Sequence, residues 1–265
     1  MVKAVFFDID GTLVPFGHHS IPDTTRAALQ RLRDAGVKLF ISTGRHPAWI
    51  DNLGDETFDG YVAANGSLCL LGDRKTEIYR HEVDHEDVKR LVPFANSHPY
   101  SFVVVPADGQ IFTTSYNDNF TTSQQMLRIP FVPIRKIEDA LDMRVVQMMV
   151  FTDPETIKRD RIFDDVLTHC LPTSWNPLFA DIVPKGSDKG VGIRKMAEHF
   201  GIDISETMAL GDGDNDIAML RAAGIGVAMG QSAEAVKQAA DYVTDTVDND
   251  GVAKALDYFS KANSQ

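Results

Sequence analysis

Two aspartates stand two residues apart directly after a hydrophobic stretch near the start of the chain. Residues 5–7 are Val-Phe-Phe, Asp8 and Asp10 follow, and Gly11 allows a sharp turn. Side chains alternate along a strand, so an extended backbone through residue 10 would point both carboxylates the same way. Like charges this close repel unless a cation lies between them, which indicates a hard ion such as Mg2+. Taken alone, the segment is also compatible with a strand that ends in an Asx-type turn.

A second acidic segment, residues 211–216, reads Gly-Asp-Gly-Asp-Asn-Asp after a short apolar stretch. A calcium loop starting at Asp212 would need glycine at its sixth position and glutamate at its twelfth, but the chain has Ile217 and Ala223 there. A dinucleotide-binding fingerprint starting at residue 211 would need glycine where Asp216 stands. The remaining interpretation is a metal site at the end of a strand.

Composition and charge restrict the class of partner. The 265 residues are 43% hydrophobic and 24% charged, with a net charge of -12, as expected for a soluble globular protein. A phosphate backbone needs a basic surface, so we expect no nucleic acid and no membrane among the partners. Cys69 and Cys170 are too few for a disulfide framework and indicate reduced thiols in the cytoplasm. We find no apolar stretch of membrane-spanning length and no targeting segment.

The fold expected from the hydrophobic pattern is α/β. Strands are predicted at residues 5–9, 37–42 and 60–64, with a helix from Ser20 to Gly36 and a hairpin turn at Asn65 and Gly66. The alternation returns at Lys189 and continues to residue 259, including a helix capped by Ser232. This rhythm predicts a Rossmann-like parallel sheet with helices on both faces, formed by residues 1–81 and 187–265.

Residues 82–186 interrupt the alternation and are predicted to form an inserted α+β domain. We expect helices at residues 84–97 and 155–167, and strands at 102–106, 110–114 and 145–152. Two chain crossings connect this insert to the core, and an ordered insertion of about a hundred residues is usually functional. We interpret it as a lid that selects the substrate.

Four motifs lie in order along the chain: Asp8-Ile9-Asp10-Gly11-Thr12, Thr43, Lys189 and Gly211-Asp212-Gly213-Asp214-Asn215-Asp216. With these motifs, the chain resembles the haloacid dehalogenase (HAD) superfamily of phosphotransferases. The placement of the insert between Thr43 and Lys189 is similar to the Cof-like sugar-phosphatase branch, which has a large α/β (C2B-type) cap. Lys185 is a competing lysine, but Lys189 and Gly190 open a helix as the family pattern does.

The resemblance implies a role for each motif residue. Asp8 would be the nucleophile that forms an aspartyl-phosphate, and Asp10 the general acid and base. Mg2+ would be held by the side chains of Asp8 and Asp212 and the backbone carbonyl of Asp10. The phosphate-binding residues would be Thr43, Gly44, Lys189 and Asn215, with Asp216 behind them to position the lysine, the metal's water or the phosphate.

The resemblance further implies a Mg2+-dependent phosphatase that acts on small phosphorylated metabolites, with hexose and pentose phosphates as first choice. A phosphomutase on the same fold and a sugar-phosphate-binding protein without turnover are the alternatives. We expect a monomer or a weak homo-oligomer. Arg45 and His46 are expected to support structure. Five further residues are candidates for substrate selection: His18, His19, Tyr116, Trp175 and Asn176.

Overall fold

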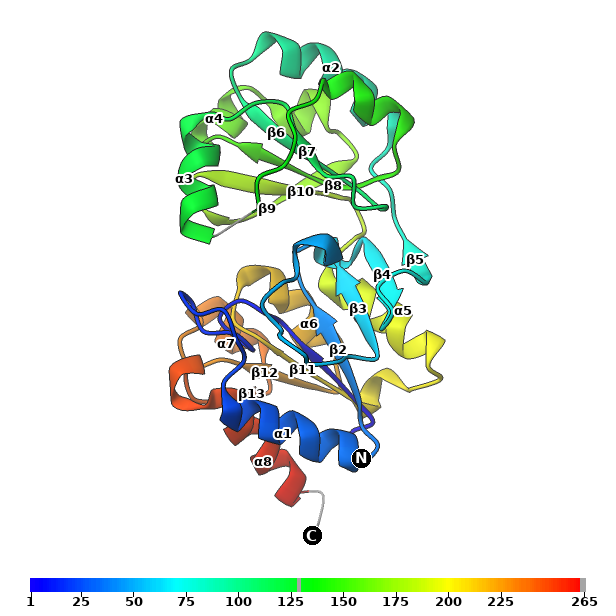
Figure 1. The fold of residues 1–265 in the computed structure, drawn as a ribbon, viewed down its shortest axis with the longest axis vertical. Helices are drawn as coiled ribbons and strands as arrows, with labels where there is room; N and C mark the ends of the chain where they lie inside the picture. The colour runs from blue at the N-terminus through cyan, green and yellow to red at the C-terminus, as the bar shows by residue number, and fades with distance from the viewer. Residues whose placement is uncertain (128–129, 263–265) are drawn as a thin grey trace. The chain divides into compact units, whose positions relative to one another are not determined.

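The computed structural model describes residues 1–127 and 130–262 (Figure 1). They divide into two compact units, one formed by Met1–Tyr79 and the chain from Asp188 onward, the other by Arg80–Ser187. Only the first unit is divided in the sequence, because the second is inserted into it. Arg80, His81 and Ser187 therefore group with the insert. Among the described residues, no helix is both long and apolar enough to cross a membrane.

The first unit is built on a sheet that contains eight strands in the described residues. In spatial order they are β13 (Tyr242–Val243), β12 (Ile225–Ala228), β11 (Thr207–Gly211), β1 (Ala4–Phe7), β2 (Lys38–Ser42), β3 (Gly60–Ala63), β4 (Leu68–Leu71) and β5 (Glu77–Arg80). β1 lies inside it, parallel to β2 on one side and to β11 on the other. The parallel arrangement extends to β3, β12 and β13, whereas β4 returns antiparallel to β3.

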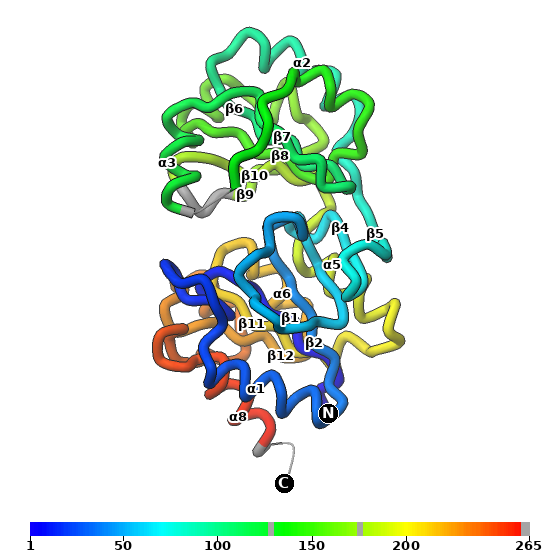
Figure 2. Tube along the Cα trace, in the orientation of Figure 1, coloured from blue at the N-terminus to red at the C-terminus, as the bar shows by residue number. Residues whose placement is uncertain are grey.

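Helices cover both faces of this sheet, as its hydrophobic strands require. Val5 and Phe7 of β1 face one cluster of buried side chains, and Ala4 and Phe6 face another. The first cluster packs against α1 (Asp23–Asp34) and α8 (Gly251–Ala262), which lie side by side in Figure 2. The second packs against α5 (Lys189–His199), α6 (Ile217–Ala222) and α7 (Glu234–Ala239). A sheet buried on both faces confirms the predicted α/β class.

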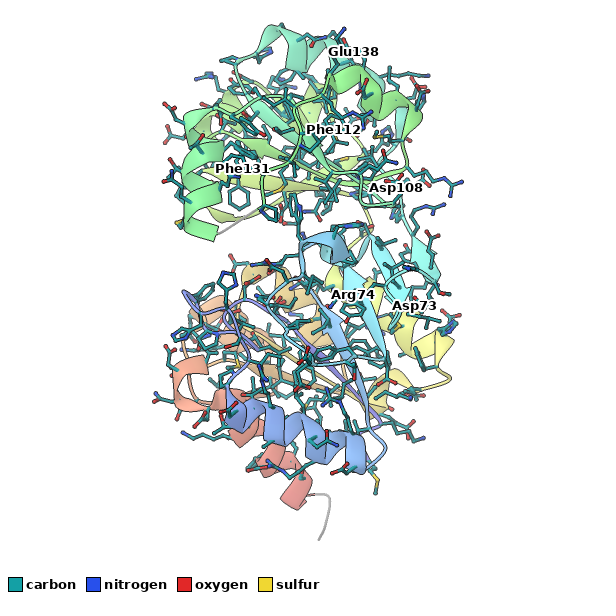
Figure 3. The ribbon with its side chains drawn as sticks, viewed as in Figure 1. Asp73, Arg74, Asp108, Phe112, Phe131 and Glu138 are labelled. Atoms are coloured by element: carbon teal, nitrogen blue, oxygen red, sulfur yellow. The ribbon has the colours of Figure 1, made fainter. Side chains whose placement is uncertain are left out.

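The second unit contains an antiparallel sheet of five strands within the described residues. Phe112 lies in its hydrophobic core, whereas Phe131 is 78% exposed (Figure 3). The spatial order is β7 (Phe112–Thr113), β6 (Ser101–Pro106), β8 (Val145–Phe151), β10 (Phe179–Pro184) and β9 (Cys170–Asn176). The helices are α2 (His85–Ser97), α3 (Asp118–Leu127) and α4 (Pro154–Arg159).

Two local predictions were wrong. The helix predicted at 155–167 breaks, because α4 ends at Arg159 and Arg161 adopts a left-handed φ of 50°. A separate turn of π-helix, Ile162–Val166, follows and buries both of its end residues. Ser232 is not a helix cap: α7 begins after Ala233, whose methyl side chain cannot accept a hydrogen bond. The helix predicted at 155–167 breaks because its two segments both bury side chains, and one straight helix cannot direct both segments into the core.

Candidate active site

Three candidate site residues lie at the carboxyl edge of the first unit's sheet. Asp8 follows β1, Thr43 follows β2 and Asp212 follows β11. Because β1 pairs in parallel with both neighbours, the three residues leave the sheet at the same edge. The chain order reverses around β1, and such a switch point is where open α/β sheets form their sites.

Lys189 connects two of the carboxylates at this edge. Its Nζ lies 2.7 Å from Oδ1 of Asp8 and 2.5 Å from Oδ1 of Asp216, and its side chain is fully buried. Lys189 is the first residue of α5, where Asp188 caps the helix by accepting a hydrogen bond from the amide of Val191 at 2.7 Å. A buried ammonium is tolerated only with such partners.

The charges in this cluster shift one another's protonation. Burial lowers the pKa of Lys189, but the carboxylates of Asp216 and Asp8 outweigh it and hold the pKa above its ordinary value. Burial, followed by the negative charge of Asp216, raises the pKa of Asp8, and Lys189 only partly opposes this. Burial and Asp216 likewise raise the pKa of Asp212 to about 7. One lysine therefore does not compensate the three acids.

The excess negative charge fits a hard cation. Candidate ligand atoms of Asp8, Asp212 and Asp216 lie within 4.8 Å of one another. Asp216 is already engaged, because its Oδ1 binds Lys189 and its Oδ2 accepts the amides of Asp212 and Gly213, both at 2.9 Å. Asp8 and Asp212 are thus the carboxylates suited to a divalent ion, which prefers oxygen ligands. The structure places Asp216 as the residue that holds the lysine and the 211–216 loop together.

The predicted phosphate-binding residues lie around the end of β2. The hydroxyl oxygen of Thr43 accepts the amide of Arg45 at 3.1 Å, so its own proton can be donated to a ligand. A Cβ on Gly44 would lie 3.1 Å from Oδ1 of Asn65. The same Oδ1 accepts Nδ2 of Asn215 at 2.9 Å. Asn65, which the sequence marked only as a turn residue, therefore joins this group.

Asp10 lies beyond the extended strand, because β1 ends at Phe7, so strand alternation does not set its direction. Its carboxylate binds Arg45 instead, with Nε to Oδ2 at 2.7 Å and Nη2 to Oδ1 at 2.8 Å. Sequence reasoning gave Arg45 only a structural role, although its place next to Thr43 and Gly44 was a signal. It also missed Gln231, whose Nε2 donates to the carbonyl of Gly11 at 2.6 Å.

The sequence pattern of haloacid dehalogenase-like hydrolases matches residues 5–256. The chain belongs to this family. The predicted superfamily is confirmed, and the chain is an enzyme of the phosphatase type.

Individual members are similar over nearly their whole length. The structure of the HAD subclass IIB sugar phosphatase BT4131 has a TM-score of 0.89 and 39% identity, with 98% of this chain and 99% of that chain covered. The structure of the phosphatase BT1666 from Bacteroides thetaiotaomicron has a TM-score of 0.88 and 33% identity, with 98% of this chain and 96% of that chain covered. The 5-amino-6-(5-phospho-D-ribitylamino)uracil phosphatase YcsE of Bacillus subtilis (strain 168) is 30% identical over 258 residues, or 96% of this chain and 94% of the relative.

The residues predicted to select the substrate of this haloacid dehalogenase-like hydrolase fall in different units. His18 and His19 are exposed in the loop of the first unit that precedes α1. Tyr116 belongs to the insert, where its hydroxyl donates to the carbonyl of Val132 at 2.5 Å. The side chains of Trp175 and Asn176 lie outside the described part of the chain.

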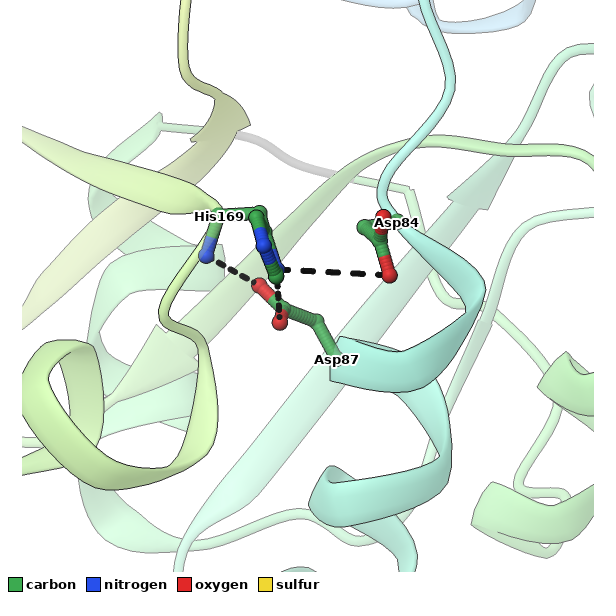
Figure 4. Close-up of side chains that lie close together, drawn as sticks. All are labelled: Asp84, Asp87 and His169. Atoms are coloured by element: carbon green, nitrogen blue, oxygen red, sulfur yellow. Dashed lines mark hydrogen bonds and ion pairs between the residues drawn. The ribbon is translucent and has the colours of Figure 1, made fainter.

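The hydrolase has a second acidic cluster, Asp84, Asp87 and His169, within the insert (Figure 4). Asp87 is fully buried and accepts the amide of His169 at 2.8 Å, and it binds Nδ1 of the same residue at 2.9 Å. Arg90 forms an ion pair with it as well. Because protein donors already surround Asp87, we interpret this cluster as a structural link between α2 and the segment before β9.

Proposed function

We propose that this chain is a Mg2+-dependent phosphatase that hydrolyses small sugar phosphates through an aspartyl-phosphate. The observation that carries the proposal is the position of Lys189, held between Asp8 and Asp216 at the sheet edge where Asp212 also lies. A cation beside a carboxylate at a buried edge suits a dianionic substrate and a carboxylate nucleophile. The family and the relatives support the same reaction class.

In the first step, a carboxylate oxygen of Asp8 attacks phosphorus as the bond between phosphorus and the ester oxygen breaks. Lys189 orients the carboxylate through Oδ1 and offsets negative charge on the transferred group. Thr43, the backbone around Gly44 and the carboxamide of Asn215 donate hydrogen bonds to the phosphoryl oxygens. The product of this step is the aspartyl-phosphate and a free alcohol.

Asp10 acts as the general acid in the first step and as the general base in the second. It donates a proton to the departing ester oxygen, so that the alcohol leaves neutral. In the second step it takes a proton from the water that attacks the aspartyl-phosphate, which releases phosphate and restores Asp8. Arg45 fixes the orientation of the Asp10 carboxylate between these steps.

Mg2+ would be held by the carboxylates of Asp8 and Asp212 and by the backbone carbonyl of Asp10. Bound there, it supplies positive charge that offsets the repulsion between the carboxylates and the substrate's phosphate. The raised pKa values of Asp8 and Asp212 support this assignment, because they mark negative charge that lacks compensation.

The inserted unit is proposed to choose the leaving group. Asp8, Thr43 and Lys189 address only the phosphoryl group, so selection of the alcohol needs other residues. One relative is a sugar phosphatase and another acts on a phosphoribitylamino compound, which supports a sugar-like alcohol. Both cysteines are free and buried, which agrees with a reducing cytoplasm.

A panel of phosphorylated metabolites, assayed for phosphate release with Mg2+ and without a bisphosphate activator, tests the proposal. We expect turnover of hexose or pentose phosphates, loss of turnover after exhaustive EDTA treatment, and none in a folded Asp8→Asn variant. Turnover that requires a bisphosphate would favour a phosphomutase. Residual activity of folded Asp8→Asn would exclude Asp8 as the nucleophile.

A further inference from the structure

The turn after β3 has an unusual backbone. Ala64, Asn65 and Gly66 have φ values of 49°, 52° and 89°, so three consecutive residues lie in the left-handed region. A two-residue hairpin turn needs at most two such residues, and asparagine and glycine suit them. Ala64 adds a third, at which a Cβ is unfavourable. Strain of this kind persists where surrounding contacts impose it, and it often accompanies function.

Contacts of Asn65 explain why the turn is held in this form. Its amide donates to the carbonyl of Thr43 at 3.1 Å. Its Oδ1 accepts Nδ2 of Asn215 at 2.9 Å. Its carboxamide also packs on Gly44, where an added Cβ would lie 3.1 Å from Oδ1 and 3.2 Å from Nδ2. One side chain thus bridges the end of β2 and the 211–216 loop.

Gly66 extends the same turn to the start of α5. A Cβ there would lie 1.9 Å from the carbonyl oxygen of Asp188 and 3.1 Å from the amide nitrogen of Lys189. Across the contact, a Cβ on Gly192 would lie 3.1 Å from the Cα of Gly66. The turn therefore touches all three segments that the proposed function assigns to phosphate binding.

We propose that Asn65 is a positioning residue for the phosphoryl group, acting through Asn215 and the Thr43–Gly44 backbone. The hydrogen bond from Asn215 to Asn65 fixes the plane of the Asn215 carboxamide. The packing on Gly44 fixes the separation between that carboxamide and the donors at the end of β2. This inference rests on the proposed function, because it assumes that these groups bind the phosphoryl oxygens. It predicts that loss of Asn65 weakens binding of the phosphoryl group in every substrate and leaves the preference among alcohols unchanged.

The decisive variant is Asn65→Gly, which tolerates the left-handed backbone and removes the side chain that carries the carboxamide. Inorganic phosphate, with Mg2+ present, is the probe. We expect its dissociation constant to rise roughly five- to tenfold, as for the loss of one or two oriented hydrogen bonds. Values of kcat/KM for a sugar phosphate and an aryl phosphate should fall by one common factor. Ala64→Gly is the matched control, since it changes the same turn but keeps Asn65, and it should bind phosphate like the parent protein.

A double-mutant cycle with Asn215→Ala tests whether Asn65 acts through Asn215. In the Asn215→Ala background, Asn65→Gly should cause a smaller loss of phosphate affinity than in the parent protein, because only the contact with the Thr43–Gly44 backbone remains to be lost. Unchanged phosphate affinity in Asn65→Gly, or losses that multiply fully in the double variant, would overturn the proposal. Calorimetric binding of phosphate needs no turnover, so this result is separate from a failure of the proposed reaction. A merely structural role would lower the melting temperature without this coupling.

Discussion

Arg45 donates two hydrogen bonds to the carboxylate of Asp10, from Nε to Oδ2 and from Nη2 to Oδ1. A third guanidinium nitrogen, Nη1, donates to the carbonyl of Trp49 at 3.1 Å. The planar guanidinium is therefore fixed on both sides, and it fixes the plane of the carboxylate in turn. The residue proposed to move protons is held by the strand end that also supplies Thr43.

Replacing Arg45 by lysine should lower kcat with little change in KM. A lysine ammonium cannot form the two parallel bonds, so Asp10 loses its defined orientation. We expect a loss of about tenfold to a hundredfold, the range that small misplacements of a catalytic group produce. The loss should be larger for sugar phosphates than for aryl phosphates, because a good leaving group needs less protonation.

Arg33→Lys is the matched control for this variant. Arg33 pairs with Glu56 at 2.6 Å and lies at the end of α1, near the amino end of β2. Its replacement should leave kcat unchanged for both sugar phosphates and aryl phosphates. Equal losses of kcat for sugar and aryl phosphates in Arg45→Lys would show that Arg45 does not act through the acid role of Asp10.

Lys189→Met should abolish turnover and destabilise the first unit. Removing one partner of a buried ion pair costs about 3–5 kcal/mol, because the remaining carboxylates stay buried without compensation. Urea unfolding measures this loss. The deficit should shrink as the pH falls, since Asp8, whose pKa is raised by burial even with Lys189 present, then becomes neutral.

Lys185→Met separates the two lysines that the sequence left in competition. Lys185 belongs to the insert and its Nζ donates to the carbonyl of Thr168 at 2.7 Å. We expect this variant to keep most of its activity towards an aryl phosphate. If Lys185→Met were inactive and Lys189→Met active, the assignment of the motif lysine would be wrong.

The sequence alone could predict the core and the sheet edge at which most candidate site residues lie, because parallel strands carry strong local signals. Apolar strands that end in Asp8, Thr43 and Asp212 must meet at one sheet edge once the alternation with helices is recognised. The direction of Asp10 could not be predicted in this way. Strand alternation stops at Phe7, and the path of the following turn decides that Asp10 meets Arg45.

The insert was harder to predict because long-range pairing determines its strands. β9 contains Pro172 and pairs with β10, whose polar Asp181 is buried opposite Thr173. Neither strand has an apolar run as long as residues 148–151 of β8, and neither strand was predicted, nor was α3. Asn65 shows the same limit in the core, since the sequence indicated its turn but not its contact with Asn215, 150 residues away.

Asp87→Asn should destabilise the insert without changing the metal requirement. The buried carboxylate compensates Arg90 and accepts the His169 amide, so its neutralisation should cost about 3 kcal/mol. Asp84→Asn is the control: Asp84 is an exposed N-cap that accepts the amide of Glu86, and asparagine caps almost equally well. A Mg2+-induced rise in melting temperature that disappears in Asp87→Asn would contradict the structural interpretation of this cluster.

The affinity for Mg2+ should depend on pH through Asp212, whose pKa is raised from 3.8 to about 7. A carboxyl whose pKa is raised by folding contributes most to stability when the pH is below its pKa in the unfolded chain. This contribution is lost as the pH rises through its pKa in the folded protein. Without cation, Asp212 therefore destabilises the fold increasingly between about pH 4 and pH 7. The cation binds the ionised forms of Asp212 and Asp8, so its apparent affinity should rise at least about tenfold per pH unit below 7.

Thermal unfolding with and without Mg2+ across this range measures the effect, because ligand binding to the folded state raises the melting temperature. We expect a small Mg2+ shift at about pH 5.5 and a large one at about pH 8, where the ionised carboxylates hold the cation. Asp212→Asn should reduce the shift at high pH and flatten its pH dependence, because its amide neither ionises nor offers a charged ligand. A Mg2+ shift of equal size at both pH values in the parent protein would show that Asp212 does not exchange a proton for the metal.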